Sequence, residues 1–265
     1  MPWPRPRGGD SLIVHSSLRR LGWVDGGART VVDALCDTVG DGTILMPTFT
    51  RYDRAYDPET SPSTVGAITE AFWNRPEAVR SAHPTKSVAA IGPDAESVVA
   101  NHELRNSIGP GSPIHRLIND RDGQILLLGV DHTTNSALHV AERLANLPYR
   151  DQIAETTIRG EDGSTETVEV NQVHCSHGFG VVGSIATRLG LEREGVSAMR
   201  PRASSTDGGF SHWSWSYSRS SLGSSSVTFP TANGVRTRGA ASLTGSDCIV
   251  TSPLHNLGSR PWISV

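Results

Sequence analysis

The sequence predicts an α/β protein whose central sheet is buried between helical layers. Two observations carry this prediction: short apolar segments alternate with segments of helical period, and several of the short segments are apolar throughout rather than at every second residue. A chain of 265 residues is also long enough to bury a substantial core. A mixed, largely buried sheet is therefore expected.

The expected strands are four short apolar segments. They are residues 11–15 (SLIVH), 43–46 (TILM), 88–91 (VAAI) and 124–128 (QILLL). A hairpin is expected further on, where residues 150–158 and 164–170 alternate around a glycine-containing turn.

The expected helices lie between and after these strands. Residues 28–39 place valine and leucine on one side at helical spacing. Ser63 is the expected N-cap of a helix over 63–73, and a helix over 113–119 begins with proline, whose missing N–H costs nothing there. Shorter helices are expected at 94–101 and 180–189.

The character of the chain changes near residue 195. Residues 197–265 hold six arginines against two acidic residues, and 204–226 are crowded with serine without either hydrophobic period. Residues 212–217 alternate, but their neighbours do not sustain a strand. We therefore expect an α/β domain over 1–195, followed by a tail over 196–265 that is either disordered or an out-of-frame translation of the true C-terminus.

Composition excludes several classes of protein. A net charge of −3 argues against a nucleic-acid surface, and the acidic excess before the tail favours cationic substrates. Three scattered cysteines are too few for a disulfide framework or a zinc cluster. Neither a signal peptide nor an apolar run of membrane-spanning length is seen, so a cytoplasmic protein without a membrane partner is expected.

The segment 129–147 (GVDHTTNSALHVAERLANL) organises the candidate site. It follows a buried strand and ends in an amphipathic helix whose polar side carries His139 and Glu142 at i, i+3. The polar side of this helix is either a solvated surface or a catalytic site in which a histidine acts beside a carboxylate. His132, His139 and Glu142 also suggest a metal, but they lack the i, i+4 histidine pair of helix-borne zinc sites, so no metal is expected.

Three other motifs have two readings each. Ser16 and Ser17 end a strand where ligands are often held, or they form a plain turn. Residues 80–87 (RSAHPTKS) either bind a polyanion or form a solvated loop. Residues 109–113 (GPGSP) either attract an anion or form a helix cap at Ser112. Cys175 lies between two histidines, but no third group completes a nucleophilic site.

Together these motifs resemble the antibiotic N-acetyltransferase family, the aminoglycoside 3-N-acetyltransferases. The matching segments, in order, are 14–27, 42–50, 80–95, 109–117 and 127–145, with a weaker match over 173–183. The resemblance covers roughly residues 8–195. It implies a three-layer α/β/α sandwich with a mixed sheet, distinct from the GNAT acetyltransferase fold.

The resemblance also implies residue roles. His139 matches the family's catalytic histidine and Glu142 the acidic residue that follows it. The coenzyme contacts for acetyl-CoA are then Ser16, Ser17, Arg80, His83, Ser87 and Ser112. Two departures stand out: His177 replaces an acidic residue that family members often carry, which removes a partner of the catalytic histidine, and the segment before the first strand is short.

The expected reaction is direct acetyl transfer to a polycationic amine. Neutral His139 accepts the proton of the attacking amine, Glu142 orients the imidazole, and backbone N–H groups at Ser16 and Ser17 stabilise the oxyanion. Asp53, Asp57 and Glu142 hold the antibiotic, and His132 is left as a loop residue.

The alternatives are an acetyltransferase for another amine, an impaired remnant that only binds coenzyme A, and a metal hydrolase. A monomer or homodimer is expected. The sequence does not specify the amine.

Overall fold

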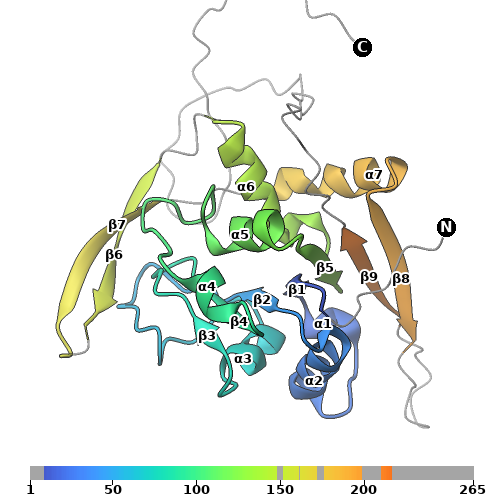
Figure 1. The fold of residues 1–265 in the computed structure, drawn as a ribbon, viewed down its shortest axis with the longest axis horizontal. Helices are drawn as coiled ribbons and strands as arrows, with labels where there is room; N and C mark the ends of the chain where they lie inside the picture. The colour runs from blue at the N-terminus through green and yellow to red at the C-terminus, as the bar shows by residue number, and fades with distance from the viewer. Residues whose placement is uncertain (1–8, 148–151, 161, 172–175, 199–209, 217–265) are drawn as a thin grey trace, which may run out of the picture. The chain divides into compact units, whose positions relative to one another are not determined.

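The computed structural model describes residues 9–147, 152–160, 162–171, 176–198 and 210–216. Their centre is a seven-stranded sheet in the order β3-β4-β2-β1-β5-β9-β8 (Figure 1). β1 runs parallel to β2 and β5, whereas β4 and β9 join antiparallel, so the sheet is mixed as expected. Its strands are β1 (Leu12–Ser16), β2 (Ile44–Pro47), β3 (Val79–Arg80), β4 (Val88–Ile91), β5 (Gln124–Leu128), β8 (Glu192–Ala198) and β9 (Phe210–Ser216).

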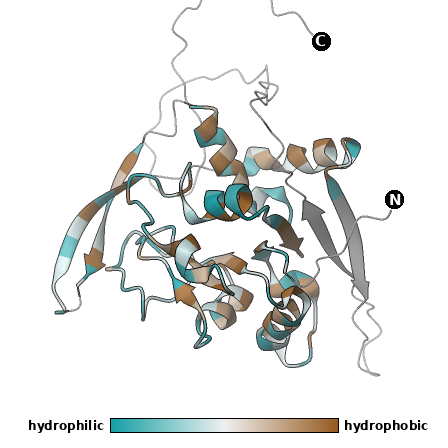
Figure 2. Cartoon of the chain, in the orientation of Figure 1, coloured by the Kyte–Doolittle hydropathy of each residue, from teal (hydrophilic) through white to brown (hydrophobic). Residues whose placement is uncertain are grey.

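The remaining elements are helices and one hairpin. The hairpin pairs β6 (Ile153–Arg159) with β7 (Thr165–Asn171) as a separate two-stranded sheet. The helices are α1 (Leu18–Leu21), α2 (Gly27–Val39), α3 (Ala67–Trp73), α4 (Ala95–Val99), α5 (Pro113–Asp120), α6 (Ala137–Leu144) and α7 (Gly180–Arg188), with short 3₁₀ turns η1 (His132–Thr134) and η3 (His177–Phe179). Figure 2 shows apolar residues concentrated in the strands and on one side of several helices.

Two buried clusters lie on opposite faces of the sheet. Successive residues of a strand point to opposite faces, so Ile13 joins a cluster with α4, α5 and α6. Leu12 and Val14 join the other cluster, with α2 and α3. Strands with both faces covered need apolar residues throughout, which explains the uninterrupted apolar segments in the sequence.

Most predicted elements are present within a few residues, and one predicted helix start is wrong. Ser112 caps α5 as expected, since its hydroxyl accepts from the N–H of His115. Ser63 does not cap α3: the helix begins at Ala67 after Gly66, and the Ser63 hydroxyl instead accepts from Val65 N–H. A serine that bonds two residues ahead forms a local turn and does not start the helix.

The structure also contains three strands that the sequence did not predict: β3, which pairs with β4, and the strands β8 and β9. The expected domain boundary after residue 195 falls inside β8, and β9 pairs with both β5 and β8. The alternation around residues 212–217 thus forms a strand after all, because a partner edge is provided by β5. The rest of the predicted tail, residues 199–209 and 217–265, lies outside the described residues.

Candidate active site

The candidate site lies at the carboxyl ends of two neighbouring parallel strands. Ser16 of β1 is level with Leu128 of β5, so both chains leave the sheet at the same edge. The turn after β5 passes close to α1: at Gly129, φ is +70°, and an added Cβ would lie 3.0 Å from Arg20 Cβ and 3.2 Å from the Ser17 carbonyl oxygen. A glycine is therefore needed where these loops cross.

His139 and Glu142 contact each other on α6. His139 Nδ1 lies 2.7 Å from Glu142 Oε2, and the two side chains are only 8% and 14% exposed. Because a carboxylate only accepts hydrogen bonds, Nδ1–H donates, and the basic lone pair of the neutral ring lies on Nε2. The predicted contact is present, and it sets the histidine in the tautomer that a base requires.

Phe179 contacts this pair from a distant part of the chain. Its ring centroid lies 4.9 Å from that of His139, at an angle of 57°. Phe179 ends η3, whose Ser176 hydroxyl bonds the carbonyl of Thr133 in η1. The sequence did not predict this ring contact between Phe179 and His139. His177, also in η3, is exposed, whereas the candidate nucleophile Cys175 lies outside the described residues.

His15 is another buried histidine near the site. It is 6% exposed, and among the described residues its Nε2 has no hydrogen-bond partner. Burial lowers its pKa to about 3, and the charges of His132 and His139 act in the same direction. His15 is consequently neutral at physiological pH.

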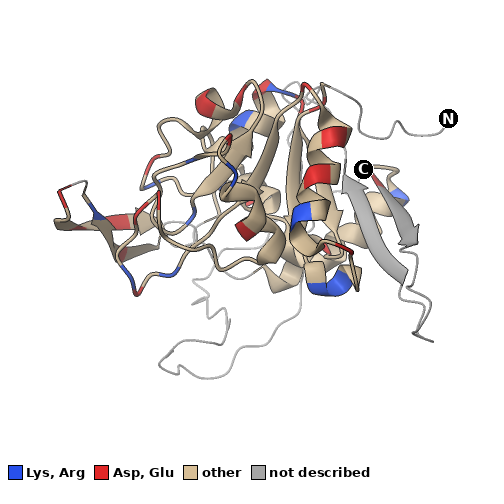
Figure 3. Cartoon of the chain, turned by 90° about the horizontal axis from the view of Figure 1, so that it is seen from below, with Lys and Arg blue, Asp and Glu red and all other residues tan. Residues whose placement is uncertain are grey.

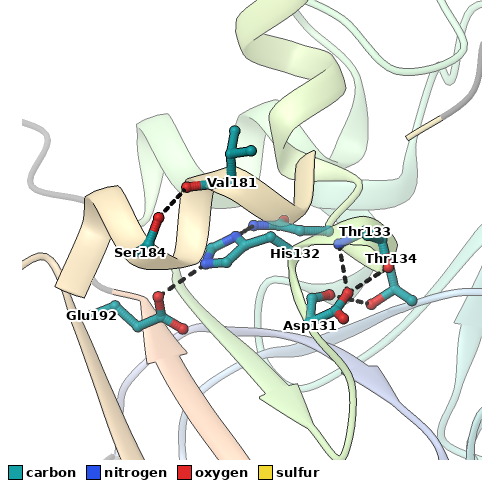
Figure 4. A network of polar contacts seen from close by, with 8 residues as sticks. Asp131, His132, Thr133, Thr134, Val181, Ser184 and Glu192 are labelled. Atoms are coloured by element: carbon teal, nitrogen blue, oxygen red, sulfur yellow. Dashed lines mark hydrogen bonds and ion pairs between the residues drawn. The ribbon is translucent and has the colours of Figure 1, made fainter. Parts of the chain in front are cut away.

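His132, expected as a loop residue, is buried in the turn η1. Its Nε2 lies 3.1 Å from Glu192 Oε2 of β8, and its Nδ1 lies 3.1 Å from Asn135 Nδ2 (Figure 4). The neighbouring Asp131 side chain accepts from the Thr133 N–H at the start of η1, and the helix α6 follows from Ala137. This turn directs the His132 side chain into the protein, where it is only 5% exposed.

A pocket of about 520 Å³ opens at the same sheet edge. It brings one cation (Arg20), one carboxylate (Asp131) and several hydroxyl groups together at the ends of β1 and β5. His139 and Glu142 are not among the residues that line it. The lining residues are Ser17, Arg20, Gly129, Val130, Asp131, Thr133 and Thr134.

Ser17 lines this pocket, but its backbone does not have the predicted role. Ser17 N–H donates to the Leu128 carbonyl at 3.0 Å, which extends the β1–β5 pairing. That N–H is used within the sheet and is not the oxyanion donor suggested by the sequence. Ser16, at the end of β1, is half-buried.

Arg80 and Ser87 belong to a different part of the sheet. Arg80 Nε donates to the hydroxyls of Thr48 at 3.1 Å and Ser87 at 3.3 Å, and the guanidinium stacks 4.4 Å from the Trp73 ring centroid. Burial lowers the arginine's pKa. Arg80 therefore joins β3, α3 and the loop after β2, and its Nε and stacked face make contacts within the protein.

His83 and Ser112 are also buried among protein partners. His83 Nδ1 accepts from the N–H of Lys86 at 3.1 Å, and burial lowers the pKa of the ring to about 3. The Ser112 hydroxyl accepts from Gly109 N–H as well as from α5. The six residues assigned to the coenzyme thus fall in three places, and only Ser17 lines the pocket.

The two predicted acceptor residues lie in the loop after β2. Asp53 forms a two-point ion pair with Arg51, and Asp57 accepts from Glu59 N–H and the Thr60 hydroxyl. These contacts lower the pKa of both carboxyls, so both are negatively charged at neutral pH. Figure 3 shows acidic and basic residues interspersed along the ribbon of the described chain.

Neither a metal centre nor a membrane-spanning helix is found among the described residues. No group of three or more His, Cys, Asp or Glu residues within the described ranges is placed to hold a metal ion. No helix within the same ranges is long and apolar enough to cross a membrane.

Comparisons with known proteins agree on one family. The family model described as aminoglycoside 3-N-acetyltransferase matches residues 13–202. Aminoglycoside N(3)-acetyltransferase IV of Salmonella sp is 35% identical over 192 residues, which cover 71% of this chain and 72% of that protein.

Solved structures of the family are also similar. A histidine-to-alanine mutant of AAC(3)-IVa in complex with a gentamicin is 33% identical, with a TM-score of 0.68 over 80% of this chain and 78% of that one. AAC-IIIb in binary complex with CoASH is 27% identical, with a TM-score of 0.64 over 72% of this chain and 82% of that one.

Proposed function

Since the chain belongs to the aminoglycoside 3-N-acetyltransferase family, we propose that it transfers an acetyl group from acetyl-CoA to the 3-amino group of an aminoglycoside antibiotic. The observation that carries the proposal is the buried hydrogen bond of 2.7 Å between His139 and Glu142. It supplies an oriented base beside a sheet edge where a pocket opens. The activity is that of an antibiotic-resistance acyltransferase.

His139 acts as the general base. The amine is mostly protonated at neutral pH, and it becomes nucleophilic only when it has lost a proton. As the amine nitrogen attacks the thioester carbon, His139 Nε2 takes a proton from that nitrogen. The C–N bond forms, the C–S bond breaks, and the proton passes to the departing sulfur, so the products are the acetylated amine and the free thiol.

Glu142 makes His139 a better base in two ways. Its carboxylate fixes the ring tautomer, and it stabilises the imidazolium that forms when the proton is taken. The Phe179 ring, packed against His139, restricts the ring's rotation and excludes water from one side. No residue of the chain needs to be acetylated in this mechanism.

The pocket at the ends of β1 and β5 suits the coenzyme. Arg20 supplies a cation for a phosphate group, and the Ser17, Thr133 and Thr134 side chains line the same pocket. The polar atoms of Arg80, His83, Ser87 and Ser112 bond within the protein, and these residues do not line the pocket.

The acceptor is a polycationic small molecule. Solved relatives are complexes with gentamicin, apramycin and sisomicin. In this chain Asp53 and Asp57 carry negative charge on one loop, and we assign them, with Glu142, to the antibiotic. We also propose that the two helical layers and mixed sheet form the family's α/β/α sandwich and that the enzyme works in the cytoplasm as a monomer or homodimer.

The proposal is tested with the purified full chain, acetyl-CoA and a panel containing gentamicin, apramycin and sisomicin. Thiol release should require an aminoglycoside, and NMR of the product should place the acetyl group on the 3-amino nitrogen. Release with simple amines only would make the protein an acetyltransferase for another amine. Calorimetric binding of coenzyme A without turnover would identify an impaired remnant.

A further inference from the structure

We propose that Glu192 and His132 are positioning residues for acetyl transfer, which fix the first turn of α6 through Asn135 and so hold His139 in place. The inference rests on the proposed function and extends it to a residue of β8, 53 positions from His139 along the chain. Figure 4 shows His132 between Glu192 and the turn that precedes α6.

The contact between His132 and Glu192 is buried and joins distant elements. The side chains are 5% and 3% exposed, and Nε2 lies 3.1 Å from Oε2. His132 begins the turn after β5, whereas Glu192 begins an edge strand of the same sheet. The pair therefore fastens the turn to the sheet.

Hydrogen-bond directions in this group are fixed by chemistry. The Asn135 Oδ1 accepts from the N–H of Ala137 at 3.1 Å, so the amide nitrogen of Asn135 faces His132 Nδ1. An amide nitrogen only donates, so Nδ1 accepts and Nε2–H donates to the Glu192 carboxylate. Glu192 thereby selects the His132 tautomer that can hold Asn135 in its capping orientation.

This chain of bonds ends at the start of α6. The first N–H groups of a helix have no partner within it, and Ser136 at the N-cap makes no side-chain cap bond. The Asn135 Oδ1 accepts the hydrogen bond from the N–H of Ala137 instead of the Ser136 side chain. His139 comes two residues later in the same first turn, so a loosened turn displaces its imidazole.

Helix α7 covers the pair and also brings Phe179 to the site. An added Cβ at Gly183 would lie 3.4 Å from His132 Cδ2 and 3.8 Å from Glu192 Oε2, which shows how closely α7 approaches. Phe179 directly precedes α7 and packs against His139. The segment formed by η3 and α7 thus contacts both histidines, His139 through Phe179 and His132 near Gly183.

A buried polar pair of this kind is poorly explained by stability alone. Replacing such a pair by apolar side chains is often neutral or stabilising, because desolvation offsets the attraction. Its directional bonds, however, specify one orientation of the Asn135 amide. This favours a role in positioning.

The test compares Glu192→Ala, Glu192→Gln, Asn135→Ala and the double variant Glu192→Ala/Asn135→Ala. Ser184→Ala is the control, because its exposed hydroxyl bonds only within α7. We expect kcat per folded enzyme to fall about tenfold or more in Glu192→Ala, by analogy with the effect of small misplacements of catalytic groups. kcat is measured at saturating acetyl-CoA, because Thr133 and Thr134 of the same turn line the pocket assigned to the coenzyme.

Two readouts separate positioning from a merely structural role. Glu192→Gln should restore most of kcat, because its amide oxygen accepts from His132, and the double variant should lose no more than the worse single variant. Unchanged kcat in Glu192→Ala at lowered thermal stability would overturn the inference. So would an additive double variant, or a Gln variant as slow as the Ala variant.

A measurement without turnover keeps the inference distinct from the proposed function. Hydrogen exchange of the Ala137 amide should be faster in Glu192→Ala than in the wild type or in Ser184→Ala. If the wild type acetylates no amine, the proposed function fails, yet this exchange difference still tests the link to α6. Equal exchange in all three proteins would refute it.

Discussion

Replacing Glu142 by glutamine tests the His139–Glu142 pair most sharply. Glutamine keeps the size of the side chain and an oxygen that accepts from Nδ1, but it removes the negative charge that stabilises the imidazolium. The carboxylate lies 2.7 Å from the ring nitrogen and is largely shielded from water. The bond is therefore charge-assisted and poorly screened.

The magnitude follows from this geometry. A hydrogen bond to a charged group contributes about 1.5–3 kcal/mol, and about 1.4 kcal/mol corresponds to a factor of ten. Because the charge acts only when His139 is protonated in the transition state, the loss should appear in kcat, on the order of 10-fold to 100-fold.

The assay is thiol release at saturating acetyl-CoA and varied aminoglycoside. Glu103→Gln, a change of the same kind outside the site, is the matched control and should behave as the wild type. A loss of less than about threefold in Glu142→Gln would refute the reasoning about charge stabilisation. A rise in KM at unchanged kcat would instead place Glu142 in substrate binding alone.

Three further outcomes are expected. In the folded protein the pKa of His15 is lowered from about 6.5 to about 3, so as the pH falls the unfolded chain binds the extra proton first. The contribution of His15 to the free energy of unfolding is therefore complete above about pH 6.5. It is lost as the pH falls toward 3, by up to about 1.4 kcal/mol per pH unit. Urea titrations from pH 7 to 5 should show this slope, reduced by about one proton in His15→Gln; an unchanged slope would contradict the assignment. Arg80→Ala should lower the free energy of unfolding by about 2–4 kcal/mol, because it leaves buried acceptors without a donor and removes the stacking on Trp73. Arg80→Lys should lower it by less. An Arg80→Ala variant with normal stability but a raised KM for acetyl-CoA would show instead that Arg80 binds the coenzyme directly. Gly129→Ala should cost about 1–3 kcal/mol in the same titration, since alanine is strained at φ +70° and crowds Arg20 and Ser17; equal stability would show that the turn relaxes.

Local patterns predicted four strands of the sheet and the contact between His139 and Glu142. The strands β1, β2, β4 and β5 were predicted because burial on both faces requires apolar side chains at every position. His139 and Glu142 are three residues apart on a helix, so their contact follows from helical geometry alone. The roles of both residues in catalysis stay predictions.

Contacts between distant segments were not predictable in this way. His132, Phe179 and Glu192 meet the site only through the packing of α7 and β8, and nothing in their local sequence indicates these partners. The strand β9 escaped prediction because its short alternation depends on the edge of β5 for pairing. Arg80 and His83 were read as ligand contacts, since the sequence does not reveal that Arg80 bonds Thr48 and Ser87 or that His83 is buried.

The proposed mechanism depends above all on His139 as the base of the reaction. The most direct test is the turnover of His139→Ala against His115→Ala, a histidine on α5 outside the pocket lining, with circular dichroism to confirm that both fold. General-base assistance is worth about 10²–10⁴-fold, so His139→Ala should lose at least about 100-fold in kcat while His115→Ala keeps wild-type turnover. Full turnover by His139→Ala would contradict the account.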